Sequence, residues 1–205
     1  MKQGKVLTLI FFICMFVGYH LIQKVFSNGH VLKIAFIDDN IPLISWFAIP
    51  YLTMYFITLI PFLLAWDEEK KLFATAFTFL FAASIAYLTF AVYQTAMVRP
   101  QLIPSNSFDY LVEYIYSVDP PVNSFPSLHV LYATLSYLCL RCINKRISLF
   151  ILPFAFLTAI STVLIKQHFF PDIIGGLILG LFAYKLIFKK VIKSASFKKE
   201  ILSAS

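Results

Sequence analysis

Long apolar runs, separated by short polar segments, make up most of this chain. A helix needs about 20 apolar residues to cross the hydrocarbon core of a bilayer, and six runs approach or reach that length. They predict transmembrane helices at Val6–Ile22, Ile44–Trp66, Leu72–Tyr93, Ser127–Ile143, Ile147–Ile165 and Ile173–Phe188. The pattern therefore predicts an all-α, polytopic membrane protein in which residues 1–205 form a single six-helix domain.

Composition supports the same fold class. Hydrophobic residues make up 60% of the 205 residues and charged residues only 13%, too few to cover a water-soluble globule of this size. The formal net charge of +7 does not indicate nucleic-acid binding, because the basic residues lie in short clusters between the apolar runs, as in oriented membrane proteins. We therefore expect the bilayer, and no nucleic acid, as a partner. The sequence leaves the oligomeric state open.

Basic residues are distributed unevenly between the two predicted sides of the membrane. Six spans put both termini on one side, and that side holds 13 of the 17 Lys and Arg residues. The other side holds the remaining four, Lys24, Lys33, Arg99 and Lys166. Because Lys and Arg accumulate in cytoplasmic segments, we expect cytoplasmic termini, in the cell membrane if the source is a bacterium. The segments expected outside are Gln23–Leu43, Gln94–Pro126 and Lys166–Asp172, with Asp38 and Asp39 as solvated loop charges.

Three groups of polar residues fall on the expected outer face. Arg99 follows the third span, Ser127 opens the fourth, and a string from Lys166 to Asp172 links the fifth to the sixth. The guanidinium of Arg99 presents a fork of donors that suits phosphate oxygens. Ser127 stands at a predicted helix N-terminus, where free N–H groups and a partial positive charge favour an anion. Taken singly, these two residues are also explained as an interfacial arginine and a helix cap.

Two histidines on the same face carry the candidate chemistry. His168 and Asp172 are four residues apart, so one helical turn would place the carboxylate behind the imidazole. An Asp that is hydrogen-bonded to one ring nitrogen fixes the tautomer and leaves the other nitrogen free to attack. His129 would then protonate the leaving group, although a lone histidine near an interface is more often structural. No metal-ligand spacing accompanies these residues, so we expect chemistry without a metal or other cofactor.

Three boxes within residues 93–176 resemble the three-part signature of the type 2 phosphatidic acid phosphatase superfamily, which also includes glucose-6-phosphatase and vanadium haloperoxidases. The boxes are Arg99-Pro100, Pro126-Ser127-Leu128-His129 and Ser161…His168-x-x-x-Asp172. The resemblance implies a six-helix membrane fold with an extracytoplasmic active site. It also implies a phosphohistidine at His168, orientation of that ring by Asp172, and acid then base catalysis by His129. The residues that would hold the phosphate are Arg99, Ser127 and the backbone at Leu128.

The boxes depart from the family pattern at two basic positions. The first box usually has Lys seven residues before its Arg, but Val92 stands there, with Gln94 close by. The third box usually has Arg after its Ser, but Thr162 follows Ser161. We expect Lys166, one turn from Thr162, to replace a missing phosphate clamp, with Gln94 and Ser161 as secondary candidates. This third box is more similar to the branch that contains inositol phosphorylceramide synthase and sphingomyelin synthase, which pass a phospho-headgroup to another alcohol.

The leading functional hypothesis is a metal-independent phosphatase or phosphotransferase that acts on a lipid phosphate, as a phosphoric monoester or pyrophosphate. Two alternatives stay open. The third box favours a phospho-headgroup transferase of the inositol phosphorylceramide synthase type. The missing basic residues favour a non-catalytic membrane protein that binds or transports lipid.

The uneven charge distribution predicts which side of the membrane the site faces. On a background without Cys14, Cys139 and Cys142, a cysteine placed in the Ser105–Ser107 loop should react with a membrane-impermeant thiol reagent in intact cells. The reason is that this loop belongs to the side poor in Lys and Arg. A gel shift measures the labelling, and a cysteine in the Lys193–Ser205 tail is the matched control for the inside. Protection of the loop together with labelling of the tail would invert the topology.

Overall fold

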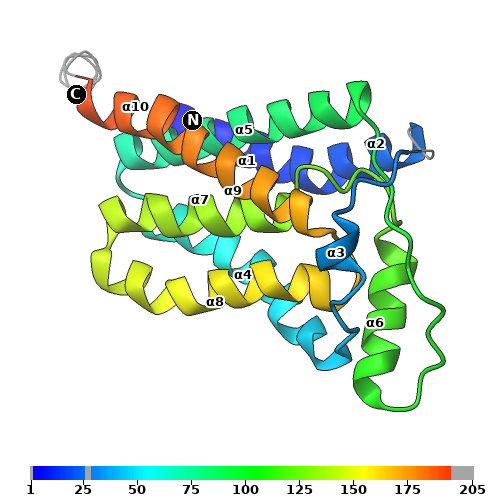
Figure 1. Cartoon of the computed structure of the whole chain (residues 1–205). Coiled ribbons are helices and arrows are strands. Elements are labelled where there is room, and N and C mark those ends of the chain that lie inside the picture. The colour runs from blue at the N-terminus through cyan, green and yellow to red at the C-terminus, as the bar shows by residue number, and fades with distance from the viewer. Residues whose placement is uncertain (1, 26–28, 195–205) are drawn as a thin grey trace.

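The computed structural model describes residues 2–25 and 29–194, which are helical over most of their length. Long helices lie roughly side by side, and the segments around α3 and α6 gather at one end of the bundle (Figure 1). In chain order the helices are α1 (Gln3–Ile13), η1 (Cys14–Gly18), α2 (Tyr19–Val25), α3 (Ala35–Asp38), η2 (Ser45–Phe47), α4 (Ala48–Leu64), α5 (Glu69–Val92), α6 (Ser107–Val118), α7 (Leu128–Ile143), α8 (Lys145–Leu164), α9 (Phe170–Ala183), η3 (Tyr184–Phe188) and α10 (Lys189–Lys193). Within the described ranges no β-strand forms.

Five helical stretches among the described residues are long and apolar enough to cross a membrane. They are Gln3–Val25, Ser45–Leu64, Glu69–Val92, Lys145–Leu164 and Phe170–Lys193, and each overlaps one predicted span. The all-α fold class is therefore confirmed, and the helix lengths are compatible with an integral membrane protein. The remaining predicted span, Ser127–Ile143, is the shorter apolar helix α7, so the count of six spans stays a prediction. Lys198 and Lys199, which entered the charge count, lie outside the described residues.

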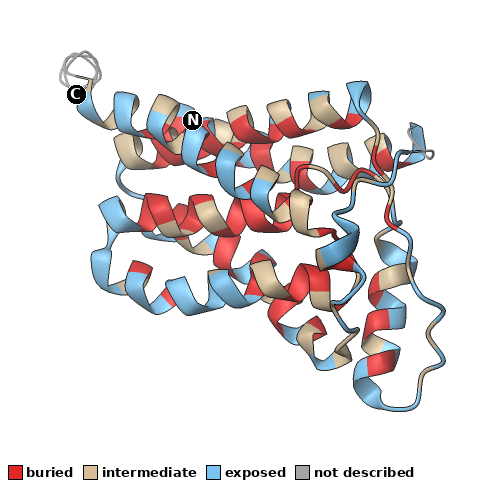
Figure 2. Cartoon of the chain, viewed as in Figure 1, coloured by how far each residue is buried: buried red, intermediate tan, exposed pale blue. Residues whose placement is uncertain are grey.

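Helix α7 lies at the centre of the bundle. It packs against α4, α5, α8 and α9, and Figure 2 shows that most of its surface is buried. Its residues Leu131, Tyr132 and Leu135 are at most 1% exposed. Because α7 has only 16 residues, its contacts with the neighbouring helices stabilise it more than its intrinsic tendency to form a helix. The surrounding helices therefore fix the position of the α7 N-terminus.

An aromatic cluster holds α1, α4 and α5 onto the central helix. The ring centroid of Phe11 lies 5.3 Å from that of Phe62, 5.2 Å from that of Phe79 and 5.4 Å from that of Tyr132. Each of these four rings is at most 1% exposed. Aromatic pairs at such spacings contribute about 0.5–1.5 kcal/mol each beyond the burial of their area. The cluster thus joins helices that are far apart in the sequence.

Two glycines bring α9 into close contact with α7. A Cβ atom on Gly176 would lie 2.5 Å from the carbonyl oxygen of Ser127, and one on Gly180 would lie 2.9 Å from the Cγ2 atom of Thr134. Real Cβ atoms do not approach other atoms so closely, so glycine is the residue that permits this spacing. Because Ser127 immediately precedes α7, the contact at Gly176 sets the starts of the two helices beside each other.

Helix α6 lies in the stretch Gln94–Pro126, for which the apolar runs predicted no element. The side chain of Asn106 caps its N-terminus and accepts a hydrogen bond from the N–H of Phe108 at 2.9 Å. Val112 and Ile115 are buried, and the helix packs against η2 and α4. An Asn cap followed by apolar residues three apart is the signal that predicts such a helix.

Segment 29–44 is fastened to the start of α9 by Asp38. This residue is only 4% exposed. Its carboxylate accepts a hydrogen bond from the backbone N–H of Phe170 at 2.7 Å, and another from an N–H of its own segment at 2.7 Å. The expectation that Asp38 is solvated was therefore wrong. Its neighbour Asp39 does form an exposed ion pair.

Gly176→Ala should push the starts of α7 and α9 apart, because a Cβ atom there would overlap the carbonyl oxygen of Ser127. We expect the free energy of unfolding to fall by about 1–3 kcal/mol, as for overpacking of a tight interior. Thermal unfolding in detergent measures the loss. The matched control is Gly18→Ala, whose Cβ atom would lie at an ordinary 3.5 Å from Tyr87. An unchanged unfolding temperature in Gly176→Ala would contradict the close contact.

Asp38→Asn keeps the shape of the side chain but exchanges one acceptor oxygen for a donor. One of the two backbone N–H groups that Asp38 now satisfies would lose its partner, at an expected cost of about 1–3 kcal/mol in the free energy of unfolding. The adjacent Asp39→Asn should change that free energy by less than about 0.5 kcal/mol, since its ion pair is exposed. Denaturant unfolding compares the two variants. Equal effects would argue against the capping role of Asp38.

Candidate active site

The turn between α8 and α9 carries His168 and is shaped by backbone hydrogen bonds. The N–H groups of Gln167 and His168 both donate to the carbonyl oxygen of Thr162, at 2.9 and 3.0 Å. Lys166 has a φ of 56°, a left-handed conformation that residues other than glycine adopt rarely. The chain reverses at this point, and His168 comes to lie just before the first turn of α9, where it is only 8% exposed.

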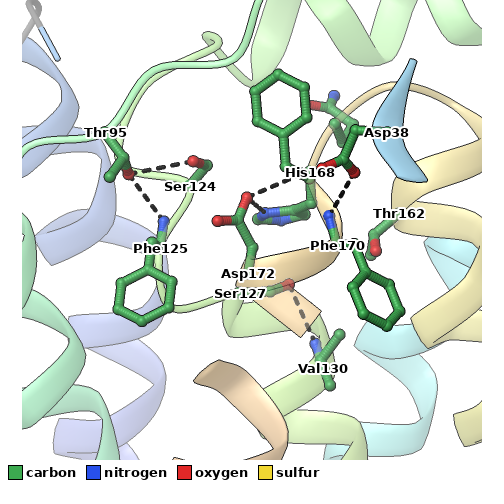
Figure 3. Close-up of polar contacts among 12 residues, drawn as sticks. Asp38, Thr95, Ser124, Phe125, Ser127, Val130, Thr162, His168, Phe170 and Asp172 are labelled. Atoms are coloured by element: carbon green, nitrogen blue, oxygen red, sulfur yellow. Dashed lines mark hydrogen bonds and ion pairs between the residues drawn. The ribbon is translucent and has the colours of Figure 1, made fainter. Parts of the chain in front are cut away.

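His168 and Asp172 form a hydrogen-bonded pair one helical turn apart (Figure 3). The Nδ1 atom of His168 lies 3.2 Å from an oxygen of the Asp172 carboxylate, and the same oxygen accepts the backbone N–H of Phe169 at 3.0 Å. Asp172 is fully buried. A carboxylate in this position favours the tautomer in which Nδ1 carries the proton. The lone pair of Nε2 is then available to attack an electrophile.

His129 lies in the first turn of α7, and its ring is close to that of His168. The two ring centroids are 5.8 Å apart and the planes meet at 64°. The ring of Tyr51, on α4, stacks on His129 with a centroid distance of 4.0 Å. The Nε2 atom of His129 is buried and has no hydrogen-bond partner among the described residues. The two imidazoles are therefore near enough to act on neighbouring atoms of one substrate.

The N-terminus of α7 meets the N-terminus of α9 at the same place. The backbone N–H of Ser127 donates to the carbonyl oxygen of Asp172 at 3.1 Å. The hydroxyl of Ser127 accepts the N–H of Val130 at 3.4 Å, so this side chain acts as the helix cap. The N–H groups of Leu128 and His129 belong to the first turn and have no acceptor within the helix. Together with the helix dipole, they form a site that favours an anion.

Thr95, which was given no role from the sequence, positions the chain just ahead of the second box. Its Oγ1 atom accepts hydrogen bonds from the hydroxyl of Ser124 at 3.1 Å and from the N–H of Phe125 at 2.9 Å (Figure 3). Its carbonyl oxygen accepts the N–H of Asn123 at 2.7 Å. The stretch after the third span therefore orients the entry into α7.

Arg99 is held by acceptors at the C-terminal end of α6. Its guanidinium donates to the carbonyl oxygens of Tyr116 at 3.2 Å and Asp119 at 2.6 Å, and to the side-chain oxygen of Gln167. It also lies over the ring of Tyr116, 4.3 Å from the centroid. Burial lowers the pKa of Arg99 from its usual value, yet the group stays charged at neutral pH. Gln167, next to His168 and not singled out from the sequence, thus connects the guanidinium to the turn.

Lys166 is directed toward segment 29–44. Its ammonium donates to the carbonyl oxygens of Ile41 and Asp38, the latter at 3.4 Å. Burial lowers the pKa of Lys166, and the nearby carboxylates oppose that shift. A cavity of about 390 Å³ is lined by both Lys166 and Arg99. In this geometry the ammonium fastens segment 29–44 to the turn that follows α8.

The two secondary candidates make their contacts elsewhere. Gln94 lines a different cavity, of about 430 Å³, beside His30, and its carbonyl oxygen accepts the N–H of His30 at 2.9 Å. Ser161 is fully buried within α8, and its hydroxyl donates to the carbonyl oxygen of Thr158 at 2.6 Å. In the described part of the chain, no hydrogen bond joins either side chain to His168.

The structure thus gathers residues from boxes that are far apart in the sequence. His168, Asp172 and His129 lie together at the N-terminus of α7, and Gln167 brings Arg99 to the same turn. Over residues 2–25 and 29–194, no group of three or more His, Cys, Asp and Glu side chains is arranged to hold a metal ion. The arrangement offers a nucleophilic nitrogen, a second imidazole, a guanidinium and a helix N-terminus. These are groups that phosphoryl transfer uses.

The chain was compared with known families and proteins. The family profile of the PAP2 superfamily matches residues 25–186, more than half of the 205 residues. That range contains all three boxes and the helices from α3 to α9. No curated protein and no solved structure matches the chain. The extent of the family match confirms the resemblance seen in the boxes: the chain belongs to the PAP2, or type 2 phosphatidic acid phosphatase, superfamily.

Proposed function

We propose that this protein is an integral-membrane phosphatase or phosphotransferase that takes the phosphoryl group of a lipid phosphate onto His168. Membership of the superfamily indicates a phosphatase or phosphotransferase. The observation that carries the finer proposal is the contact of 3.2 Å between His168 and Asp172, with the imidazole of His129 beside it. Five apolar helices support a lipid substrate, because they would hold the site at a bilayer surface. The distribution of Lys and Arg supports an extracytoplasmic site and cytoplasmic termini.

In the first step, Nε2 of His168 attacks the phosphorus atom. The P–N bond forms while the P–O bond to the leaving group breaks. Asp172 keeps the proton on Nδ1 and stabilises the positive charge that the ring acquires. Protonated His129 gives its proton to the leaving oxygen, so that a neutral alcohol departs. For a pyrophosphate, the leaving group is the lipid monophosphate.

In the second step, an acceptor hydroxyl gives its proton to His129 and attacks the phosphorus atom. The P–N bond breaks, and its electron pair returns to Nε2 of His168. With water as the acceptor the product is inorganic phosphate, and with an alcohol it is a new phosphate ester. Hydrolysis and phosphoryl transfer to an alcohol therefore use the same residues and differ in the acceptor. The transferase alternative rests on the string Lys166-Gln167-His168, which is similar to the third box of the headgroup transferases.

Electrostatic stabilisation of the transferring group would come from few donors. Negative charge spreads over the equatorial oxygens during phosphoryl transfer. The N–H of Leu128, the guanidinium of Arg99 and the Nε2 of Gln167, which has no hydrogen-bond partner among the described residues, are the groups that we assign to these oxygens. Lys166 acts on the site indirectly, by holding segment 29–44 in place. Its ammonium would reach a phosphate only after its hydrogen bonds to the carbonyl oxygens of Asp38 and Ile41 break.

Purified protein should release inorganic phosphate from lipid monophosphates or a lipid pyrophosphate, in the presence of a chelator. His168→Ala should abolish release because it removes the nucleophile. His129→Ala should slow release roughly 100- to 10,000-fold, the usual contribution of acid–base catalysis. A colorimetric phosphate assay across a panel of lipid phosphates measures both effects, and added alcohols reveal any transfer as a new ester.

The matched control for these variants is His20→Ala, since His20 is exposed and its Nδ1 atom is hydrogen-bonded to the carbonyl oxygen of Phe16, one turn earlier. It should keep wild-type release, and all three variants should unfold near the wild-type temperature. Near-wild-type release by His168→Ala or His129→Ala would sink the two-histidine mechanism. Loss of activity on chelation, restored by magnesium or zinc, would instead refute the metal-independent reaction.

A further inference from the structure

Asp119 directly follows α6, and its carboxylate accepts hydrogen bonds from three side chains on two other helices. One carboxylate oxygen accepts the hydroxyl of Tyr19 and the amide of Gln23, both on α2, each at 2.9 Å. The other oxygen accepts the hydroxyl of Tyr51, on α4, at 2.8 Å. Among the described residues no Lys, Arg or His forms an ion pair with this carboxylate. The side chains that hold this carboxylate are therefore neutral donors, while the guanidinium of Arg99 lies nearby and donates to the backbone oxygen of the same residue.

Tyr51 connects Asp119 to His129. Its ring is 1% exposed and stacks on the imidazole at a centroid distance of 4.0 Å, with 28° between the planes. Tyr55, one turn further along α4, meets the same imidazole edge-on at 6.3 Å. Since Nε2 of His129 has no hydrogen-bond partner among the described residues, ring packing largely sets the orientation of this imidazole. Asp119 in turn fixes the phenol of Tyr51.

Few charged or titratable groups face His129 from the elements packed around it. They are Tyr51 and Tyr55 from α4, His168 from the turn before α9, and Asp119 from the end of α6. Asp172 lies behind His168 and is bonded to its Nδ1 atom. Burial of His129 and the neighbouring imidazole of His168 both oppose protonation of His129, whereas the carboxylate of Asp119 favours it. Asp119 is thus the neighbour that favours the imidazolium form of His129, which is the form able to give a proton.

We infer that Asp119 and Tyr51 are positioning residues for the acid histidine: Asp119 fixes the phenol of Tyr51, and Tyr51 holds the imidazole of His129 in place. The inference rests on the proposed function, which makes His129 the acid. The step that it supports is proton transfer from His129 to the leaving oxygen as the P–O bond breaks, and no further reactant is needed. Each histidine then has its own carboxylate, Asp172 in direct contact with His168 and Asp119 one aromatic ring away from His129.

The test uses two substrates that differ in their need for a proton. Dioctanoyl phosphatidic acid releases an alcohol whose oxygen must be protonated, whereas p-nitrophenyl phosphate releases a phenolate that leaves as a stable anion. In Asp119→Asn, kcat/KM for the lipid should fall at least about tenfold, while kcat/KM for the aryl ester should stay within about twofold of wild type. The alkaline limb of the pH profile for the lipid should move to lower pH, because the amide no longer favours the imidazolium.

Two further variants sharpen the comparison. Tyr51→Phe keeps the ring that packs on His129 but removes the hydroxyl that reaches Asp119, so it should give the same pattern with a smaller loss. Glu113→Gln removes a negative charge from the exposed face of α6 and should leave both substrates and the pH profile unchanged.

Each outcome decides one question. Equal losses on both substrates in Asp119→Asn, with an unmoved pH profile, would show that Asp119 only holds the fold together and would overturn the inference. If Asp119→Asn does not fold, Tyr51→Phe decides by the same criterion. A wild-type protein that cleaves neither substrate, nor any lipid phosphate, would refute the proposed function itself. That result differs from the one that overturns the inference, in which the wild type is active and Asp119→Asn loses activity equally on both substrates.

Discussion

Asp172 joins the starts of α7 and α9, and the geometry of the site depends on this junction. Its carboxylate meets Nδ1 of His168 and the N–H of Phe169, while its carbonyl oxygen accepts the N–H of Ser127. One residue therefore fixes the nucleophilic ring and the anion-binding helix end relative to each other. The junction requires α9 to approach α7 closely, which Gly176 allows. A buried carboxylate is costly without donors; the backbone N–H of Phe169 and the ring of His168 meet Oδ2, whereas Oδ1 has no hydrogen-bond partner among the described residues.

The charges around the site follow a common pattern in the described part of the chain. Asp38 and Asp119 are satisfied by neutral N–H and O–H donors. Arg99 and Lys166 donate to carbonyl oxygens and to an amide oxygen. Among the described residues, neither cation forms a direct ion pair with a carboxylate, although acidic residues lie near both. The positive potential of the two cations remains available to an incoming anion, which is useful in a site with few cations.

The features that could be predicted from the sequence are those that a local pattern determines. Apolar runs predicted the five long helices, and the order of the boxes predicted the superfamily. Helix α6 was missed because it is short and amphipathic, although its cap at Asn106 was a usable signal. Asp38 was misjudged because its partner Phe170 lies 132 residues away.

The same limit applies to the contacts around the histidines. Tyr51 lies within a predicted transmembrane span, where an aromatic residue does not by itself indicate a role in positioning a catalytic group. The carbonyl partners of Lys166 lie more than a hundred residues upstream, so no local pattern indicated them. Such contacts are set by how distant segments fold together, and the spacing of residues within one box does not reveal them.

Arg99 meets α6 through the main-chain oxygens of Tyr116 and Asp119, at the end of the helix where carbonyl groups lack partners. Every amino acid offers such an oxygen. What natural selection must preserve for this contact is the place where α6 stops, and not the chemistry of its solvent-facing surface. The solvent-facing positions of α6, such as Glu113, are thus free to vary in sequence, whereas its buried residues Val112 and Ile115 are constrained by their packing.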